Sequence, residues 1–220
     1  MSEIIKVTGM ILSAQPQGDN DKRIVIQSVE LGKVTAFARG ARRPGNHLLA
    51  AANPFVTGTF SLIAGSSAYR LIEADVKEYF RELAEEQPAV YIGFYFLDLA
   101  DYYGREGIDG RDTLNLLYVA LKALLNKNLD NEMVRRIFEL RLFAINGDYA
   151  PDPSVMDDNL YSIVSYICTV SLGKLYTFRL DEGRIEDIAK LADKARARIM
   201  DREPKSLKIM ESFVKAMKQE

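Results

Sequence analysis

The chain has 220 residues, of which 48% are hydrophobic and 27% charged, a composition typical of a globular protein and unlike that of a disordered or collagen-like chain. Charge interrupts its apolar stretches well before the roughly 20 residues that a membrane span needs, and its first residues lack the apolar core of a signal peptide. We therefore expect a cytoplasmic protein without a membrane segment. The net charge of −2 is unevenly distributed: residues 1–72 carry +4, residues 73–160 carry −9 and residues 161–220 carry +3.

Cysteine and histidine are too scarce for several kinds of site. With only Cys168 and His47, the chain has no internal disulfide and no four-ligand zinc site. A catalytic triad with a histidine would require His47 as the base. The pairs Gly32-Lys33 and Gly173-Lys174 both lack the glycine that precedes such a pair by five residues in a phosphate-binding Walker loop. Acidic pairs such as Asp157 and Asp158 are more simply read as helix caps than as magnesium ligands. We expect a protein that is not an enzyme and that uses no metal or cofactor.

The first 80 residues have the pattern of five short strands separated by turns. Glycine, proline, asparagine and aspartate gather between alternating apolar runs, which predicts strands over residues 6–14, 23–29, 33–39, 55–64 and 68–76. Five strands without a helical pattern favour a sandwich or an oligonucleotide/oligosaccharide-binding (OB) barrel, with an SH3-like barrel as the alternative. The long connection between the third and fourth strands is where many OB folds place a helix.

A basic island lies within these strands, because no carboxylate occurs between Glu30 and Glu73. In the third strand the period of two places Lys33, Thr35, Phe37 and Arg39 on one face and small apolar residues on the other. Cations and a ring on an exposed face suit phosphate neutralisation and base stacking. The alternative is a row of ordinary solvated cations. Lys22 and Arg23 are weaker candidates because Asp19 and Asp21 adjoin them, and the candidate DNA-binding residues are Lys33, Phe37, Arg39, Arg42, Arg43, His47 and Arg70.

Beyond about residue 81 the apolar period becomes helical. It predicts helices over residues 88–103, 113–127, 131–145, 160–172, 184–199 and 204–218, with Asp130 as the N-cap of the third. The first helix has Val90, Phe94, Leu97 and Leu99 on its expected core face, and the last has Leu207, Met210, Val214 and Met217. The predicted fold is α+β, with an OB-fold nucleic-acid-binding domain at 1–80 and a helical domain at 81–220.

At residues 38–43, Ala-Arg-Gly-Ala-Arg-Arg, the sequence resembles the signature of the RecO family of bacterial recombination mediators. Further segments resemble the family in the same order, including Asn53-Pro54-Phe55, the Phe-Glu-Leu-Arg-Leu run at 138–142, and Gly147 followed by Tyr149-Ala150-Pro151. Many members carry a four-cysteine zinc module after that last turn, whereas this chain offers only Cys168. The resemblance therefore implies a member without the zinc module, whose region is held by ordinary packing.

The resemblance implies a non-catalytic protein of DNA repair, associated with the nucleoid, that binds single- and double-stranded DNA and anneals complementary strands. It also implies that the protein acts with RecR to load RecA onto DNA coated with single-strand-binding protein (SSB). Annealing requires only that phosphate repulsion is screened and that two strands are held close. The alternative is a helical scaffold that docks a partner peptide such as the acidic, apolar-ended SSB tail, with the 204–218 helix as one wall of the groove and DNA binding secondary.

Overall fold

The computed structural model describes residues 3–217, with side chains to Phe213. The chain forms two compact units, one of Met1–Arg81 with Leu97–Leu114 and the other of Glu82–Phe96 with Asn115–Glu220. The predicted division after residue 80 assigns residues 97–114 to the helical domain, whereas in the structure they belong to the first unit. No described helix is both long and apolar enough to cross a bilayer.

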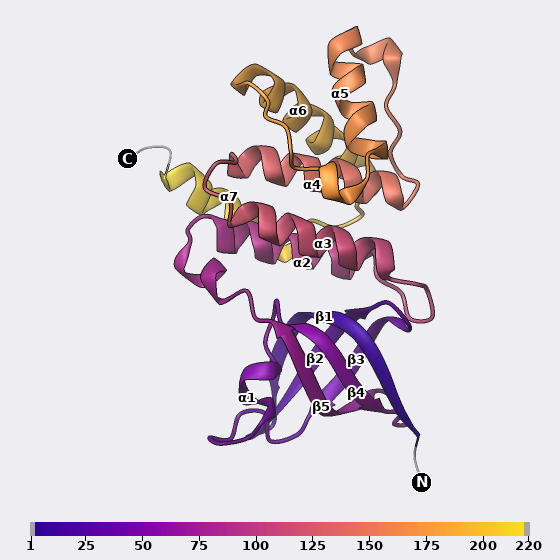
Figure 1. Cartoon of the computed structure of the whole chain (residues 1–220), viewed down its shortest axis with the longest axis vertical. Helices are drawn as coiled ribbons and strands as arrows, with labels where there is room; N and C mark the ends of the chain where they lie inside the picture. Colours follow the sequence, from indigo (N-terminus) through magenta and orange to yellow (C-terminus); the bar gives the residue numbers. More distant parts are fainter. Residues whose placement is uncertain (1–2, 218–220) are drawn as a thin grey trace. The chain divides into compact units, whose positions relative to one another are not determined.

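Five strands close into a barrel in the first unit, in the order β1-β2-β3-β5-β4 with β1 also paired to β4 (Figure 1). Neighbouring strands are antiparallel except β3 and β5, which run parallel. This is the OB fold, so the SH3-like alternative is wrong and the α+β class is confirmed. The elements are β1 (Ile4–Gln17), β2 (Asp21–Ser28), β3 (Gly32–Ala38), α1 (Leu48–Ala51), β4 (Thr57–Ile63) and β5 (Tyr69–Glu78).

The barrel core confirms the predicted alternation on β3. Val34, Ala36 and Ala38 point inward and are buried together with side chains of β1, β2, β4 and β5, while Lys33 and Phe37 are only partly buried on the outer face. Two residues of the α1 region, Leu48 and Ala52, belong to the same core, so this short helix covers one end of the barrel (Figure 1). The helix thus lies where the long third connection predicts one.

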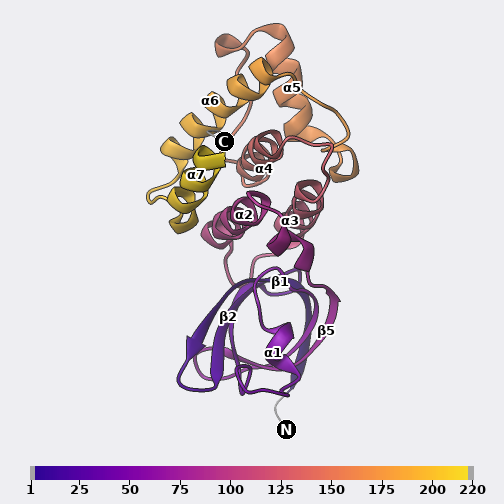
Figure 2. The ribbon, with the colours of Figure 1, turned by 90° about the vertical axis from the view of Figure 1, so that its left-hand side faces the viewer.

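The remaining elements are helical: η1 (Arg81–Glu85), α2 (Ala89–Tyr103), α3 (Arg111–Leu124), α4 (Asn131–Ile145), η2 (Pro153–Val155), α5 (Asp158–Thr169), η3 (Leu172–Lys174), α6 (Glu182–Ile199) and α7 (Lys205–Met217). In the second unit α4 packs against α5 and α6 (Figure 2). Asp130 accepts a hydrogen bond from the Met133 backbone N–H at 2.8 Å, which confirms it as the N-cap of α4.

The predicted core face of α2 is partly wrong. Phe94 is 40% exposed and Val90 is only partly buried, while Leu97 and Leu99 are buried as expected. The helix is apolar on most of its circumference, so the choice of face depends on which neighbours cover it, which its own pattern does not specify. In α7, Leu207 and Met210 are buried as predicted, whereas the side chains of Val214 and Met217 lie outside the described residues.

Hydrogen bonds order the segment that follows α4, from Asp152 to Leu160. Asp152 accepts from the Ser154 N–H at 2.9 Å and Asp157 from the Leu160 N–H at 2.8 Å, which caps η2 and α5. The Arg184 guanidinium on α6 contacts Asp157 at 2.8 Å. These contacts lower the pKa of the Asp157 carboxyl, first through the Leu160 backbone hydrogen bond and then through Arg184. Caps and one ion pair thus order this segment.

Arg141 on α4 binds backbone carbonyls at the end of α5. Its guanidinium donates to the carbonyls of Ile167 at 3.3 Å and Val170 at 3.0 Å, and also to that of Cys168. Arg141 thus ties α4 to α5 through backbone carbonyls and not through a carboxylate. Carbonyls at a helix C-terminus have no partners within the helix and carry partial negative charge, so they suit a cation.

A buried ionic cluster joins α2, α4 and α6 within the second unit. Glu139 is fully buried and accepts from the Tyr95 hydroxyl at 2.6 Å, from Arg135 Nε at 3.2 Å and from Arg136 Nη1 at 2.9 Å. Arg196 Nη1 lies 3.4 Å from the same carboxylate. Burial alone would raise the pKa of Glu139, but the charges of Arg135 and Arg136, with the Tyr95 hydrogen bond, outweigh it and lower that pKa. The carboxylate is therefore the counterion of three arginines.

Candidate nucleic-acid interface

A cross-strand row of two cations and a ring lies on the outer face of the barrel. Phe37 on β3 is directly opposite Arg23 on the antiparallel strand β2 and opposite Arg70 on the parallel strand β5. Side chains at paired positions of neighbouring strands lie on the same face and contact one another. The parallel β3–β5 pairing thus places Arg70 beside a strand from which it is more than thirty residues distant in sequence.

Arg39 and Arg43 extend this row into the loop that follows β3. Both are exposed, and among the described residues neither side chain has a hydrogen bond or an ion pair; the same is true of Arg70. We call Arg23, Phe37, Arg39, Arg43 and Arg70 the cationic patch. It lies on the β2–β3 side of the barrel, the side on which OB folds bind oligonucleotides and oligosaccharides.

Contacts with the β1–β2 turn fix the shape of the loop after β3. Gly40 has a φ of +67°, and its N–H donates to Asp21 Oδ1 at 2.8 Å. A side chain at this position would adopt an unfavourable left-handed conformation and meet the Asn46 side chain at 2.7 Å. Arg42 donates through Nη1 to the carbonyls of Gly18 at 3.0 Å and Asp19 at 3.1 Å. Gly40 therefore lets the chain turn sharply out of the strand, and Arg42 secures the loop.

Two other candidate residues also have protein partners. The Lys33 ammonium lies 3.3 Å from Asp101 Oδ1 and donates to the Asp101 carbonyl at 2.5 Å. His47 Nε2 lies 3.1 Å from the Ile72 carbonyl oxygen, and the residue occupies the N-cap position directly before α1. The structure brings Phe37, Arg39, Arg43 and Arg70 together around Arg23, whereas it commits Lys33 and the Arg42 Nη1 group to structural contacts.

Sequence reasoning underrated Arg23 and did not find Tyr69 or Glu106. Asp21 lies two residues before Arg23 in the chain, but its Oδ1 accepts a hydrogen bond from the Gly40 N–H. Arg23 instead donates to the Thr35 hydroxyl at 3.3 Å. Tyr69 is paired with the inward-facing Ala36 on β3 and packs against the barrel core, so its side chain lies on the opposite face from that of its neighbour Arg70. No charge or spacing pattern in the sequence indicated it. Among residues 3–217, no group of three or more His, Cys, Asp and Glu side chains is arranged to hold a metal ion.

The fold and this surface define an OB-fold protein with an appended helical unit and a basic, aromatic barrel face. The family model described as "Recombination protein O N terminal" matches residues 1–80. Among curated proteins, the "DNA repair protein RecO" of Alkaliphilus metalliredigens is 33% identical over 66% of this chain and 58% of its own length, and that of Exiguobacterium sp. is 30% identical over 64% and 57%. Residues 1–80 therefore match the N-terminal domain of the RecO family, and the chain is similar to RecO proteins beyond it.

The extent of the likeness differs between relatives. With the first two relatives, the aligned region spans less than two thirds of the relative's length. The "DNA repair protein RecO" of Clostridium perfringens is 23% identical over 96% of this chain and 99% of its own length. The resemblance inferred from residues 38–43 is thereby confirmed.

Proposed function

We propose that this chain is a DNA-binding recombination mediator of DNA repair. In this proposal it binds single- and double-stranded DNA, anneals complementary strands and, with RecR, helps to load RecA onto SSB-coated DNA at the nucleoid. The observation that carries the proposal is the cationic patch, where Phe37 lies between Arg23 and Arg70 and is continued by Arg39 and Arg43. The name of the relatives, DNA repair protein RecO, supports the same role.

The patch suits annealing because the process needs no catalytic group. Guanidinium groups neutralise phosphates and release their counterions, while the face of an aromatic ring stacks on a base of any identity. Two strands held close on one surface meet at a raised effective concentration, so pairing is accelerated by electrostatics and proximity. The protein accordingly acts as a non-enzyme, without a cofactor.

Strand annealing of complementary labelled oligonucleotides, without nucleotide or metal, tests the proposal. The variant Arg39→Glu/Arg43→Glu is expected to anneal at least about tenfold more slowly than the wild type, because it reverses the charge that attracts phosphates. Lys6→Glu/Lys77→Glu is the matched control, since it changes the net charge equally at exposed barrel positions outside the patch. Equal loss in both variants, or no annealing by the wild type at low salt, contradicts the proposal.

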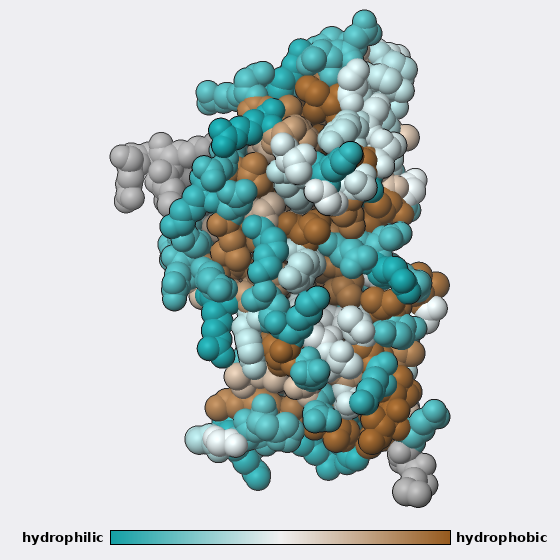
Figure 3. Space-filling view, viewed as in Figure 1, coloured by the Kyte–Doolittle hydropathy of each residue, from teal (hydrophilic) through white to brown (hydrophobic). Residues whose placement is uncertain are grey.

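A second function, peptide docking by the helical unit, is favoured by two cavities there. One, of about 290 Å³, lies between α3 and η3 and is lined mainly by apolar and aromatic side chains with Lys122. The other, of about 150 Å³, lies between residues 149–156 and α6 and combines Met156 and Leu191 with Lys194 and Arg198. Among the side chains that the structure describes, none from α7 lines either cavity. Hydrophobic residues also reach the viewed surface among hydrophilic ones (Figure 3).

In the smaller cavity the two cations Lys194 and Arg198 outnumber the one carboxylate, Asp152, which suits an acidic peptide that ends in an apolar residue, as the SSB tail does. Replacement of Lys194 by glutamate is expected to weaken the binding of such a peptide by about tenfold, because like charges then face each other. Lys190→Glu is the control, since this exposed lysine lies one turn away on α6 and outside the cavity. Fluorescence anisotropy of a labelled peptide measures the effect. Equal weakening in both variants would exclude this cavity as the docking site.

A further inference from the structure

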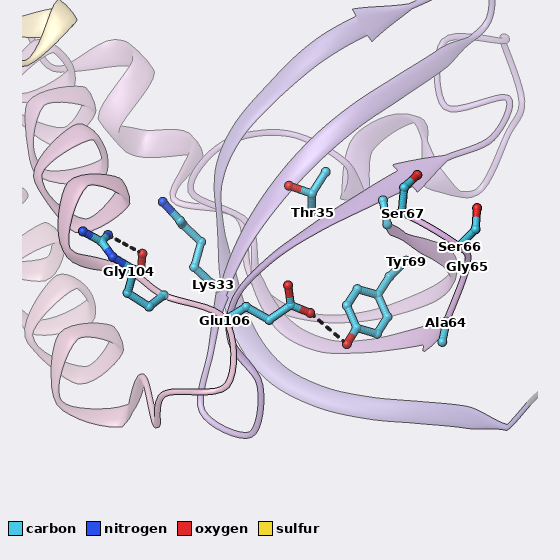
Figure 4. A pocket seen from close by; sticks show the side chains of 11 residues that line it. Lys33, Thr35, Ala64, Gly65, Ser66, Ser67, Tyr69, Gly104 and Glu106 are labelled. Carbon is cyan, nitrogen blue, oxygen red and sulfur yellow. Dashed lines mark hydrogen bonds between the residues drawn. The ribbon is translucent and has the colours of Figure 1, made fainter.

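A cavity of about 510 Å³ adjoins the cationic patch within the first unit. It is lined by Lys33 and Thr35 on β3, by the β4–β5 loop at residues 64–68, by Tyr69 and by residues 104–106 (Figure 4). Its volume is within the range of roughly 300–1,000 Å³ that small-ligand sites occupy. Thr35 lines the cavity and accepts a hydrogen bond from Arg23 at 3.3 Å, so the cavity and the patch share a border at Thr35.

The cations at the cavity wall already have partners. Lys33 contacts Asp101, and Arg105 donates through Nη1 to the carbonyls of Tyr102 at 2.6 Å and Gly104 at 2.8 Å. In Figure 4, Lys33 extends toward the segment at Gly104, away from Tyr69. Phosphates are therefore better matched by the unpaired arginines of the patch than by the cavity itself.

A carboxylate and a ring remain inside the cavity. The Tyr69 hydroxyl donates to Glu106 Oε1 at 3.1 Å, and the two side chains point toward each other (Figure 4). Burial first, and then this hydrogen bond, raise the pKa of Tyr69, so its hydroxyl stays protonated as the donor. Glu106 Oε2 has no hydrogen-bond partner among the described residues, and Glu106 is exposed. The free oxygen can accept a hydrogen bond but cannot donate one.

We propose that this cavity takes one unpaired nucleobase of a DNA strand bound on the cationic patch and discriminates against thymine. A carboxylate repels phosphate but accepts hydrogen bonds from the amino groups of cytosine, adenine and guanine. Thymine has no amino group, and its one donor on that edge, N3–H, lies between two carbonyl oxygens that repel the Glu106 carboxylate, so it makes a weaker contact. The hydroxyls of Thr35, Ser66 and Ser67 both donate and accept, so they do not select. The inference rests on the proposed function, because the patch must first hold the strand.

The test compares the affinities of labelled oligo(dC), oligo(dT) and oligo(dU) for the full chain by fluorescence anisotropy at low salt. The Kd for oligo(dT) and for oligo(dU) is expected to be about fivefold higher than for oligo(dC), as for a single hydrogen-bonded base contact. Uracil has the same hydrogen-bonding edge as thymine but lacks its methyl group. Weak binding that oligo(dU) shares with oligo(dT) is therefore caused by hydrogen bonding and not by steric exclusion of the methyl group. Glu106→Gln should abolish the preference, because an amide also donates to carbonyl oxygens.

Glu73→Gln is the matched control, since it removes the same charge from an exposed position of β5 outside the cavity. It should keep the preference even if all three Kd values fall with the lost repulsion. Binding without a base preference, a preference that oligo(dU) does not share with oligo(dT), or a preference that survives in Glu106→Gln overturns the inference and leaves the proposed function intact. Absence of any DNA binding overturns both.

Discussion

Replacement of Glu139 by glutamine is expected to lower the free energy of unfolding by about 3–5 kcal/mol, the usual cost of removing one partner of a buried ion pair. Glu139 is fully buried, and Arg135 and Arg136 retain only 4% and 7% of their side-chain exposure. The amide keeps the size of the carboxylate but leaves these two guanidinium groups with only partly exposed counterions, namely Glu132, Asp193 and Glu211. Denaturant unfolding followed by the helical circular dichroism signal measures the change.

Glu186→Gln is the control for this prediction. Glu186 pairs with Lys190 on α6 at 2.9 Å, but the two side chains are 68% and 67% exposed, and such surface pairs contribute at most about 1 kcal/mol. If Glu139→Gln costs no more than Glu186→Gln, the buried cluster does not stabilise the helical unit.

The effect of Glu139→Gln should also depend on pH. The pKa of Glu139 is lower in the folded protein than its ordinary value of 4.5, so the unfolded chain binds the proton more readily. The carboxylate therefore contributes its full stabilisation above about pH 4.5, and the contribution declines as the pH falls through the folded pKa. The difference in unfolding free energy between wild type and variant is expected to narrow in acid. A difference that widens there contradicts the assignment.

Neutralisation of Arg39 and Arg43 by glutamine is expected to reduce the salt dependence of single-strand binding. If each arginine contacts one phosphate, the slope of log K against log salt becomes shallower by about 1.4, because a single strand contributes about 0.7 per phosphate contact. Arg42 is left unchanged, since its Nη1 group holds the carbonyls of Gly18 and Asp19 and its loss would disturb the loop. A titration repeated over a salt series gives the slope.

Lys6→Gln/Lys77→Gln provides the comparison for the salt series. It removes two positive charges from exposed positions of the same barrel, outside the cationic patch. Its slope should stay close to that of the wild type, since long-range attraction alone releases few counterions. Equal slopes for the wild type and the arginine variant would mean that Arg39 and Arg43 make no phosphate contacts.

Local sequence patterns were sufficient for the barrel strands and most helices. Alternation on β3 identified its inner and outer faces, and Asp130 located the start of α4, because both signals depend on near neighbours in the chain. The face of α2 was less predictable, since Phe94 belongs to a helix that is apolar nearly all round. The period of a helix shows its faces only when they differ in polarity.

The candidate site was only partly predictable for a related reason. The sequence identifies Phe37, Arg39 and Arg43 as a local group, but the parallel register that places Arg70 beside Phe37 is a long-range property. Glu106 reaches Tyr69 from a segment 37 residues away, which no spacing rule anticipates. Equally, the ion pair between Lys33 and Asp101 could not be read from a strand pattern that only shows which face Lys33 occupies.

The anchored loop after β3 also affects the cost of binding. Lys22 donates to the Ala52 carbonyl at 3.0 Å and to Asn53 Oδ1 at 2.7 Å at the far end of the loop, while Asp21 and Arg42 fasten its beginning. A segment that is already fixed loses little conformational entropy when a ligand binds. Each rotamer-rich side chain that is ordered before binding makes the binding free energy more favourable by about 0.5–1.5 kcal/mol. Association should therefore proceed as near-rigid docking, at a rate set by electrostatic encounter and not by folding of the loop around its ligand.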